Sequence, residues 1–208
     1  MDSGISSETG YTEILLCRHG ETDWNLEGKF QGWHDVPLND MGRAQAEHIS
    51  KAVAKRVDAV WTSPLVRARD TGAVVAADAG VELRTDERLK ERNLGVLEGR
   101  TADEVQNTHP AVWAAWTAAE PLPSEANAEA DAAVIARFEA VFQEIAMLHP
   151  SQRVVVVAHG GAFRCLLKAS AGNASITTIF VSRDGGWHVT KLGDSSHLPQ
   201  EGLKVSGM

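Results

Sequence analysis

The sequence has little that would mark a secreted, membrane-spanning or metal-binding protein. It contains only two cysteines, Cys17 and Cys165, whose separation fits neither a disulfide framework nor a metal-ligand pair. The first eleven residues are polar and acidic and lack the basic and apolar regions of a signal peptide. The longest aliphatic run, VVVVA at 154–158, is far too short to cross a bilayer. These absences favour a soluble protein in a reducing compartment, and we expect a cytoplasmic location.

An excess of positive charge is also missing. The net charge of the 208 residues is −8 at pH 7, whereas nucleic acids and anionic membranes attract basic surfaces, so neither is expected as a main partner. A small anionic substrate remains compatible, because a local pocket can be positive on an acidic protein. No internal repeat, low-complexity tract or clear linker divides the chain. We therefore expect one domain at 13–193 between two tails, 1–12 and 194–208.

Short apolar runs alternate along the chain with segments of helical periodicity. The expected strands are 13–17, 59–62, 81–84 and 154–158, and two more around a turn at Asp184–Gly186. The expected helices are 40–56, 64–80, 102–107, 110–117, 126–148 and 162–171. This alternation predicts an α/β fold with a largely parallel central sheet.

Two of the expected strands end in the same way. The first is followed by Arg18, His19 and Gly20, and the strand at 154–158 is followed by His159 and two glycines. Ligands of open α/β sheets bind outside the carboxyl ends of the strands, so both histidines are expected at one crevice. The helix that begins after His159 offers free N–H groups, which suit a phosphate. One histidine at a strand end is more often structural than catalytic, whereas two with adjacent glycines favour a functional site.

The octet RHGETDWN at 18–25 resembles the signature of the histidine phosphatase superfamily, the phosphoglycerate mutase-like proteins. Four further blocks resemble that family in its order: FQGWHDVPLNDMGRAQA (30–46), SPLVRARDTG (63–72), RLKERNLGVLEG (88–99) and VVVVAHGG (154–161). The resemblance implies a three-layer α/β/α sandwich with a mostly parallel central sheet. It also implies phosphoryl transfer through a phosphohistidine, without a metal.

The resemblance implies a role for each residue of the site. His19 would attack phosphorus, Glu91 would protonate the leaving oxygen, and Arg18, Arg67 and His159 would hold the phosphoryl oxygens. The substrate pocket would be completed by Asn25, Gln31, Gly32 and Gly160. Only a neutral imidazole can attack, so the other ring N–H should be held by a fixed acceptor, such as a backbone carbonyl. A guanidinium group can donate two hydrogen bonds to two oxygens of one phosphate. Arginines can therefore stabilise the negative charge of the phosphoryl group without a metal ion.

Several of these residues also have a purely structural interpretation. Without the resemblance, Glu91 in the charged run DERLKER would belong to a solvated surface. Arg67 would be an exposed helix charge, Asn25 a turn residue and Gln31 a surface residue. The tryptophans of the expected helix 110–117 are core residues or part of a lid.

The charges of the substrate-side segment separate the two activities of the family. Its mutases have a lysine eleven residues after the catalytic glutamate, where this chain has Ala102, and an arginine pair where residues 110–130 contain no basic residue. A bisphosphorylated intermediate would therefore be held poorly, and water would reach the phosphohistidine. We expect a phosphatase of a small phosphorylated metabolite that needs no cofactor. The alternative is a phosphoglycerate mutase that depends on 2,3-bisphosphoglycerate.

A third hypothesis is a phosphate-binding regulator that has lost catalysis, which the presence of all five catalytic residue types argues against. The stretch Ser124-Glu125-Ala126 departs from the Gly-Glu-Ser triplet of many family phosphatases. Contacts from that loop, the particular substrate and the oligomeric state are therefore not predicted.

Overall fold

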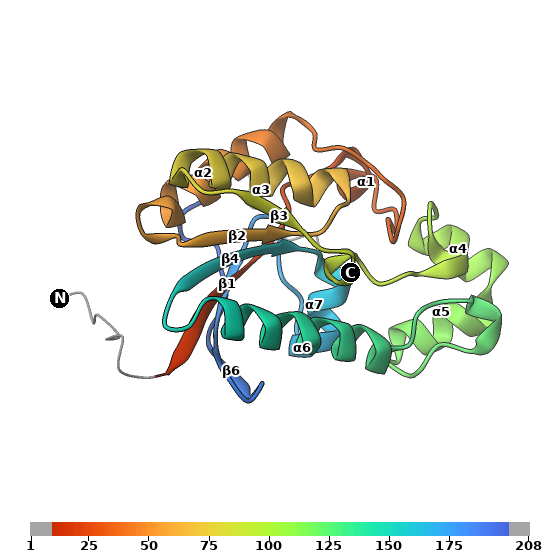
Figure 1. Ribbon diagram of the computed structural model, residues 1–208. Helices are drawn as coiled ribbons and strands as arrows, with labels where there is room; N and C mark the ends of the chain where they lie inside the picture. The colour runs from red at the N-terminus through yellow and green to blue at the C-terminus, as the bar shows by residue number, and fades with distance from the viewer. Residues whose placement is uncertain (1–9, 200–208) are drawn as a thin grey trace.

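The computed structural model describes residues 10–199, which form a three-layer α/β/α sandwich (Figure 1). Within this range the central sheet has the strand order β3-β2-β4-β1-β5-β6. The strands are β1 (Tyr11–Arg18), β2 (Ala59–Thr62), β3 (Leu83–Thr85), β4 (Arg153–Ala158), β5 (Ile176–Ser182) and β6 (Trp187–Asp194). The first four are mutually parallel, while β5 runs antiparallel to β1 and β6 antiparallel to β5. The predicted largely parallel sheet is confirmed, with an antiparallel hairpin at one edge.

Helices cover both faces of the sheet, as Figure 1 shows. Helices α2 (Asp40–Val53) and α3 (Val66–Ala79) lie on one face, and α6 (Asp131–Leu148) and α7 (Gly160–Leu167) lie on the other. The shorter helices are α1 (Asp23–Leu26), α4 (Ala102–Thr108) and α5 (Pro110–Thr117), and the 3-10 turns are η1 (Ala54–Arg56), η2 (Glu87–Leu89), η3 (Gly95–Leu97) and η4 (Ser124–Ala126). Helices α4 and α5 extend beyond one end of the sheet. Among the described residues, no helix combines the length and the apolar character needed to cross a membrane.

Strand β4 shows why the sheet is buried on both sides. Val154 and Val156 pack into the core beneath α6 and α7, whereas Val155 and Val157 pack into the core beneath α2 and α3. Successive side chains of a strand point to opposite faces, so a run of four valines fills both cores at once. The predicted continuous apolar strand is confirmed, and it fixes the position of the residue that follows it, His159.

Helix α6 begins later than its periodicity predicts. Its apolar stripe faces the core, where Val134, Phe138, Val141, Phe142 and Ile145 are 0% exposed and Ile135 is partly buried. The expected start at 126 is wrong, because residues 124–126 form a 3-10 turn and Asn127 adopts a left-handed conformation with φ of 48°. The helix therefore begins at Asp131.

Two further features concern the ends of the domain and its smaller core. Residues 11–12 and 194 belong to strands, and Leu198 is buried in the core beneath α2 and α3. Residues 1–9 and 200–208 of the two predicted tails lie outside the described residues. A separate apolar cluster joins the loop after β3 to helices α4 and α5, and its buried members are Leu94, Leu97, Val105, Val112 and Ala126.

Candidate active site

The two predicted histidines lie side by side because they follow adjacent parallel strands. Arg18 pairs with Ala158 in the register of β1 and β4, and the backbone N–H of His19 donates to the carbonyl of Ala158 at 3.0 Å. The centroids of the His19 and His159 rings are 5.2 Å apart. This separation is close to the spacing of neighbouring strands, roughly 4.8 Å. The sheet therefore brings the two imidazoles to one place.

His19 is held in the tautomer that a nucleophile requires. Its Nδ1 lies 2.7 Å from the carbonyl oxygen of Gly20, and because a carbonyl only accepts, Nδ1 carries the hydrogen. The lone pair is therefore on Nε2. The side chain is only 3% exposed. Burial, followed by the charges of Arg67 and Arg18, lowers the pKa of His19 well below its ordinary value, which keeps the ring neutral.

The two predicted arginines are anchored by backbone carbonyls. Arg67 is 0% exposed and donates from Nη1 to the carbonyl of His34 at 2.7 Å and from Nη2 to that of Gly32 at 2.8 Å. Arg18 donates from Nη1 to the carbonyl of Ala171 at 2.6 Å. Burial lowers the pKa of Arg67 to about 10, so it remains a cation at neutral pH. Its burial excludes the interpretation of Arg67 as an exposed helix charge.

Four polar nitrogens of this group are buried without a partner among the described residues. They are Nε of Arg18, Nε of Arg67 and both ring nitrogens of His159. Buried polar atoms are nearly always hydrogen-bonded, so this convergence of unpaired nitrogens fits an anion with several oxygens. Burial, with the charge of Arg67 next in size, lowers the pKa of His159 well below its ordinary value. We call Arg18, His19, Arg67 and His159 the phosphoryl cradle.

The two glycines after His159 let α7 approach the site closely. A Cβ added to Gly160 would lie 2.9 Å from Nε of Arg18, and one added to Gly161 would lie 2.8 Å from Oε1 of Glu91. Both distances are shorter than real Cβ contacts allow. Glycine is therefore favoured at both positions, because the backbone of Gly160 packs against Arg18 of the cradle and the backbone of Gly161 packs against the carboxyl group of Glu91.

Glu91 lies over the first turn of α7. Its Oε2 accepts from the backbone N–H of Gly161 at 2.9 Å, and its Oε1 accepts from those of Ala162 at 2.6 Å and Arg92 at 2.7 Å. Free N–H groups at a helix start are natural partners of a carboxylate. Glu91 is only 7% exposed, so the interpretation as a solvated surface residue is wrong.

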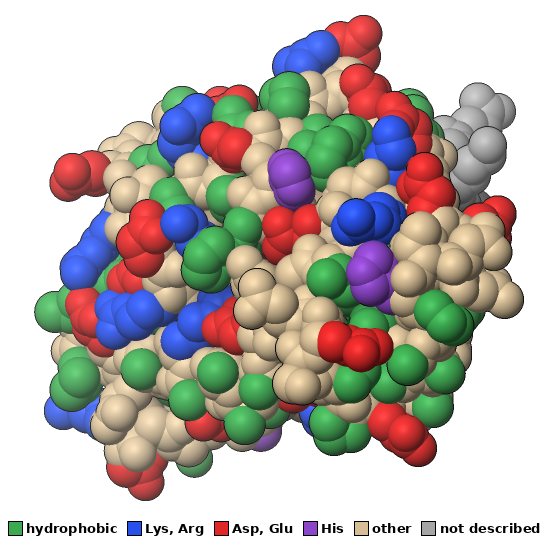
Figure 2. Space-filling model, turned by 90° about the vertical axis from the view of Figure 1, so that its right-hand side faces the viewer, with side chains coloured by type: hydrophobic (Ala, Val, Ile, Leu, Met, Phe, Trp, Pro, Cys, Tyr) green, Lys and Arg blue, Asp and Glu red, His purple; other side chains and the backbone are tan. Residues whose placement is uncertain are grey.

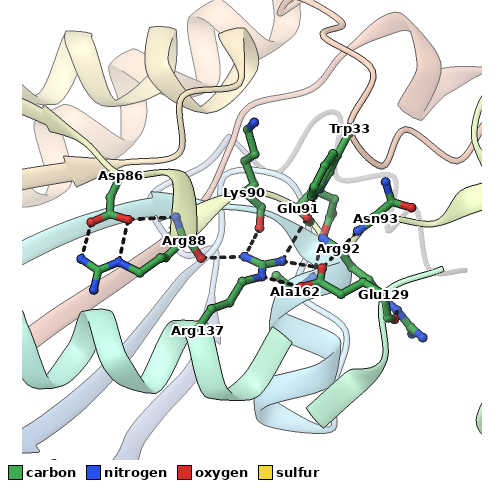
Figure 3. Close-up of polar contacts among 10 residues, drawn as sticks. All are labelled: Trp33, Asp86, Arg88, Lys90, Glu91, Arg92, Asn93, Glu129, Arg137 and Ala162. Carbon is green, nitrogen blue, oxygen red and sulfur yellow. Dashed lines mark hydrogen bonds and ion pairs between the residues drawn. The ribbon is translucent and has the colours of Figure 1, made fainter. Parts of the chain in front are cut away.

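The acid loop, residues 88–99, is held from below by an arginine that the sequence analysis did not identify (Figure 3). Arg137 of α6 donates from Nη1 to the carbonyls of Arg88 and Lys90, both at 2.6 Å, and from Nη2 to that of Glu91 at 3.1 Å. From the opposite side, Nε1 of Trp33 donates to the same Glu91 carbonyl at 2.7 Å. The backbone of the acid is thereby fixed from two directions.

Glu129 completes this support and orients Arg137. The two side chains form an ion pair with distances of 2.8 Å and 3.0 Å. The backbone N–H of Glu129 donates to the carbonyl of Asn93 at 2.8 Å, which ties the segment before α6 to the acid loop. In the sequence, Arg137 is one charged position beside the apolar stripe of α6, and such a position is usually solvated. Nothing in that pattern marks it as part of a site.

A cavity of about 350 Å³ lies at this end of the sheet. It is lined by eight of the nine predicted site residues: Arg18, His19, Asn25, Gln31, Gly32, Arg67, Glu91 and Gly160. The ninth, His159, is fully buried and its ring lies beside that of His19. The lining also includes Lys29, Trp116 and Arg164, which the sequence analysis did not assign to the site. The face toward α4 and α5 intersperses acidic, basic and hydrophobic side chains (Figure 2), whereas the cradle cations are recessed.

Asn25 and Gln31 have different environments in the cavity wall. Oδ1 of Asn25 accepts from the backbone N–H of Thr22 and from Nδ2 of Asn173, both at 3.1 Å, so Asn25 shapes the turn and also lines the cavity. Gln31 is 8% exposed, which excludes a surface position, and its Oε1 is buried with no hydrogen-bond partner in residues 10–199. Gln31 therefore has hydrogen-bonding capacity left for a ligand.

The described residues contain no group of three or more His, Cys, Asp or Glu side chains placed to hold a metal ion. Cys17 and Cys165 are free and buried, and burial raises the pKa of their thiols to about 12 and about 11. Both behave as small core residues, as expected.

The sequence matches known families over nearly all of the described range. Residues 14–194 match the profile of the histidine phosphatase superfamily (branch 1). The chain belongs to this superfamily. It is 34% identical to the metal-independent phosphoserine phosphatase of Arabidopsis thaliana, over 98% of this chain and 90% of that protein. It is also 34% identical to phosphoglycerate mutase-like protein 4 of the same plant, over 97% and 94%.

Other relatives include both activities of the superfamily. A probable phosphoglycerate mutase of Cronobacter sakazakii is 29% identical, over 92% of this chain and 97% of that protein. Among solved structures, a mycobacterial glucosyl-3-phosphoglycerate phosphatase is similar with a TM-score of 0.80 and 28% identity, over 88% of this chain and 99% of that one. The expected fold and family are therefore confirmed.

Proposed function

We propose that this chain is a phosphatase that hydrolyses a small phosphorylated metabolite through a phosphohistidine on His19. The observation that carries the proposal is the hydrogen bond from Nδ1 of His19 to the Gly20 carbonyl, which leaves the Nε2 lone pair free beside two buried guanidinium groups. A neutral, oriented imidazole next to a cationic oxyanion site is the arrangement that phosphoryl transfer requires.

In the first step, Nε2 of His19 attacks phosphorus and the bond to the ester oxygen breaks. Arg18, Arg67 and His159 stabilise the charge that spreads over the three remaining oxygens. Glu91 gives its proton to the leaving alkoxide, so an alcohol departs and a phosphohistidine remains. The fixed acceptor at Nδ1 stabilises the positive charge that the ring acquires during attack.

In the second step, water replaces the alcohol. Glu91, now a carboxylate, takes a proton from the water as its oxygen attacks phosphorus, and the N–P bond breaks. Inorganic phosphate leaves, His19 returns to its neutral form and Glu91 is protonated again. No metal ion or other cofactor takes part in the proposed cycle, in line with the name of the metal-independent plant relative.

The charge of the substrate-side segment favours hydrolysis over mutase activity. Position 102 is alanine and residues 110–130 contain no basic residue, so few cations would retain a bisphosphorylated intermediate between turnovers. The alternative, a mutase dependent on 2,3-bisphosphoglycerate, is kept because several relatives are named mutases. The substrates named for the phosphatase relatives, phosphoserine and glucosyl-3-phosphoglycerate, are candidates for this chain.

We also propose a small-molecule partner rather than a nucleic acid or a membrane. The net charge of the chain is −8, and of the two cradle arginines Arg67 is buried and Arg18 is partly buried, so neither makes a basic surface. The two free, buried cysteines suit a reducing compartment such as the cytoplasm.

Hydrolysis of an aryl phosphate tests the proposal directly. We expect turnover that is unchanged by a chelator and lost in His19→Ala. In the wild type, a rapid quench in alkaline denaturant, in which the N–P bond of phosphohistidine is stable, should trap a phosphorylated protein. Absence of turnover on a broad panel of phosphate esters would support the binding-protein hypothesis instead. Incubation with 3-phosphoglycerate separates the two enzymes: formation of 2-phosphoglycerate that depends on 2,3-bisphosphoglycerate and exceeds phosphate release would establish the mutase.

A further inference from the structure

Two cations of the cavity wall have no role in the cycle above, and only one of them has a carboxylate partner among the described residues. The basic residues that line the cavity are Arg18, Lys29, Arg67 and Arg164. Arg18 and Arg67 belong to the phosphoryl cradle, and Nζ of Lys29 forms an ion pair with Glu27 at 2.7 Å. Among the described residues, Arg164 makes one long hydrogen bond, from Nη2 to the carbonyl of Trp116 at 3.4 Å. Among residues 10–199 no carboxylate neutralises the charge of Arg164, although this side chain is half-buried.

The position of Arg164 on α7 places it near the leaving group. It follows Gly160 by four residues and Gly161 by three, so it lies on the helix face that the two glycines present to the cavity. The carboxyl group of Glu91 is bound to the N–H groups of Gly161 and Ala162, one turn earlier. Because Glu91 would protonate the leaving oxygen, Arg164 lies beside the part of the substrate that departs.

Trp116 holds the guanidinium group in place. The guanidinium carbon of Arg164 is 4.6 Å from the centroid of the Trp116 ring. Trp116 in turn packs edge-on against Phe30, with centroids 5.1 Å apart, within the small core of α4 and α5. A guanidinium stacked on an aromatic face loses mobility while its edge donors stay available. Residues 110–130 thus supply an aromatic support, and the cation comes from α7.

We propose that Arg164 binds a carboxylate on the leaving group, so that the substrates are phosphate monoesters whose alcohol also carries a carboxylate. This inference rests on the proposed function. A single guanidinium fork matches the two oxygens of a carboxylate, whereas a second phosphate has a larger charge that a single cation would leave poorly neutralised. Arg164 would thereby determine specificity without touching the phosphoryl group.

Two pairs of esters that differ by the carboxylate test this inference. O-phosphoserine is compared with O-phosphoethanolamine, and 3-phosphoglycerate with glycerol 3-phosphate. In the wild type we expect kcat/KM to favour the carboxylated member of each pair by about 10- to 100-fold. In Arg164→Gln the ratio should collapse towards one, with the main loss on the carboxylated esters. Arg164→Lys, which keeps the charge but not the fork, should be intermediate.

The matched control is Lys168→Gln. Lys168 is an exposed cation at the end of the same helix, 3.7 Å from Asp131, and its substitution should leave both ratios unchanged. Equal losses on both members of a pair in Arg164→Gln would make Arg164 a structural residue and overturn the inference. A wild-type ratio near one would also overturn it, as would a preference for bisphosphorylated esters that Arg164→Gln abolishes. Aryl phosphate hydrolysis, measured in parallel, shows whether the proposed function itself fails.

Discussion

The phosphoryl cradle and the acid loop are positioned by different kinds of structure. His19 and His159 follow directly after two adjacent strands. Arg67 belongs to α3, which packs on the same sheet, and its guanidinium group is bound by the carbonyls of Gly32 and His34. The acid loop, residues 88–99, contains only short 3-10 turns. Three of its backbone carbonyls accept hydrogen bonds from Arg137 of α6. The pairing of β1 and β4 sets the geometry of the two histidines in the phosphoryl cradle, and hydrogen bonds from Arg137 set the geometry of the acid loop.

This difference separates what each half should do when it is disturbed. In the proposed cycle the cradle binds the phosphoryl group, which all phosphate esters share, so its loss should affect every substrate. The acid serves only leaving groups that need a proton, so its displacement should affect alkyl esters far more than aryl esters.

The largest effect is expected from Arg67→Gln. Removing a buried donor of transition-state charge should lower kcat/KM about 10²- to 10³-fold, and equally for an alkyl phosphate and 4-nitrophenyl phosphate. Steady-state kinetics on both esters measure this, and thermal unfolding checks that the fold survives the loss of the bonds to His34 and Gly32. A loss confined to the alkyl ester would remove Arg67 from the cradle.

A smaller and selective effect is expected from Arg137→Lys. Lysine keeps the charge opposite Glu129 but has no fork to bind the carbonyls around Glu91, so the acid should be misplaced. We expect kcat/KM to fall about 10- to 100-fold for alkyl esters and less than about threefold for 4-nitrophenyl phosphate. The control is Arg153→Lys. Arg153 of β4 forms an ion pair with Glu13 of β1, at the ends of these strands that are far from His19 and His159. Equal losses on both esters would show that Arg137 supports the fold and not the acid.

The buried imidazoles of the cradle should make stability depend on pH. Burial lowers the pKa of both His19 and His159 in the folded protein, whereas the unfolded chain binds their protons near pH 6.5. Below that pH the unfolded state therefore holds more protons than the folded state. As the pH is lowered, the free energy of unfolding should fall by up to about 1.4 kcal/mol per pH unit for each histidine. Urea unfolding at pH 7.5, 6.5 and 5.5 measures the slope. His159→Gln should make it shallower, and an unchanged slope would contradict the burial of a neutral ring.

The smallest effect is expected from adding one methyl group to Gly160, which lies beside the phosphoryl cradle, or to Gly161, which lies beside Glu91. Gly160→Ala would press on Nε of Arg18, and Gly161→Ala would press on Oε1 of Glu91. Each should lower kcat/KM about fivefold to tenfold, the first for all esters and the second mainly for alkyl esters. Both positions are helical, where alanine is favoured over glycine, so thermal stability should not fall. Identical substrate profiles for the two variants would mean that the halves are not separable.

The cradle could be predicted from the sequence because its residues follow strong local patterns. An apolar run that stops at a histidine marks a strand end, and the family signature assigns the chemistry. The expected backbone acceptor for the second ring nitrogen of His19 is confirmed, and it is the carbonyl of Gly20. The burial of Arg67 and Gln31 was less predictable, since these residue types are mostly exposed.

The support of the acid could not be predicted, and the reason is physical. Arg137 and Arg164 lie on ordinary amphipathic helices, and their partners are backbone carbonyls and a ring from distant segments. A side chain that binds a backbone carbonyl places almost no constraint on the residue type that supplies the carbonyl. The sequence therefore contains no pair of residue types from which the contact could be predicted. The late start of α6 has a similar origin, because the left-handed conformation of Asn127 depends on its neighbours in space.

The adjacency of β1 and β4 has a consequence for how such enzymes diversify. The 5.2 Å between the His19 and His159 rings is close to one interstrand step of roughly 4.8 Å, and it is set by the pairing of β1 and β4 rather than by a loop. Residues 102–122 pack mainly on the small apolar cluster of α4 and α5, whereas Glu129 is tied to Asn93 and Arg137. We therefore expect a change of substrate among related enzymes to come from substitutions in this outer segment, while the two strand ends keep their spacing.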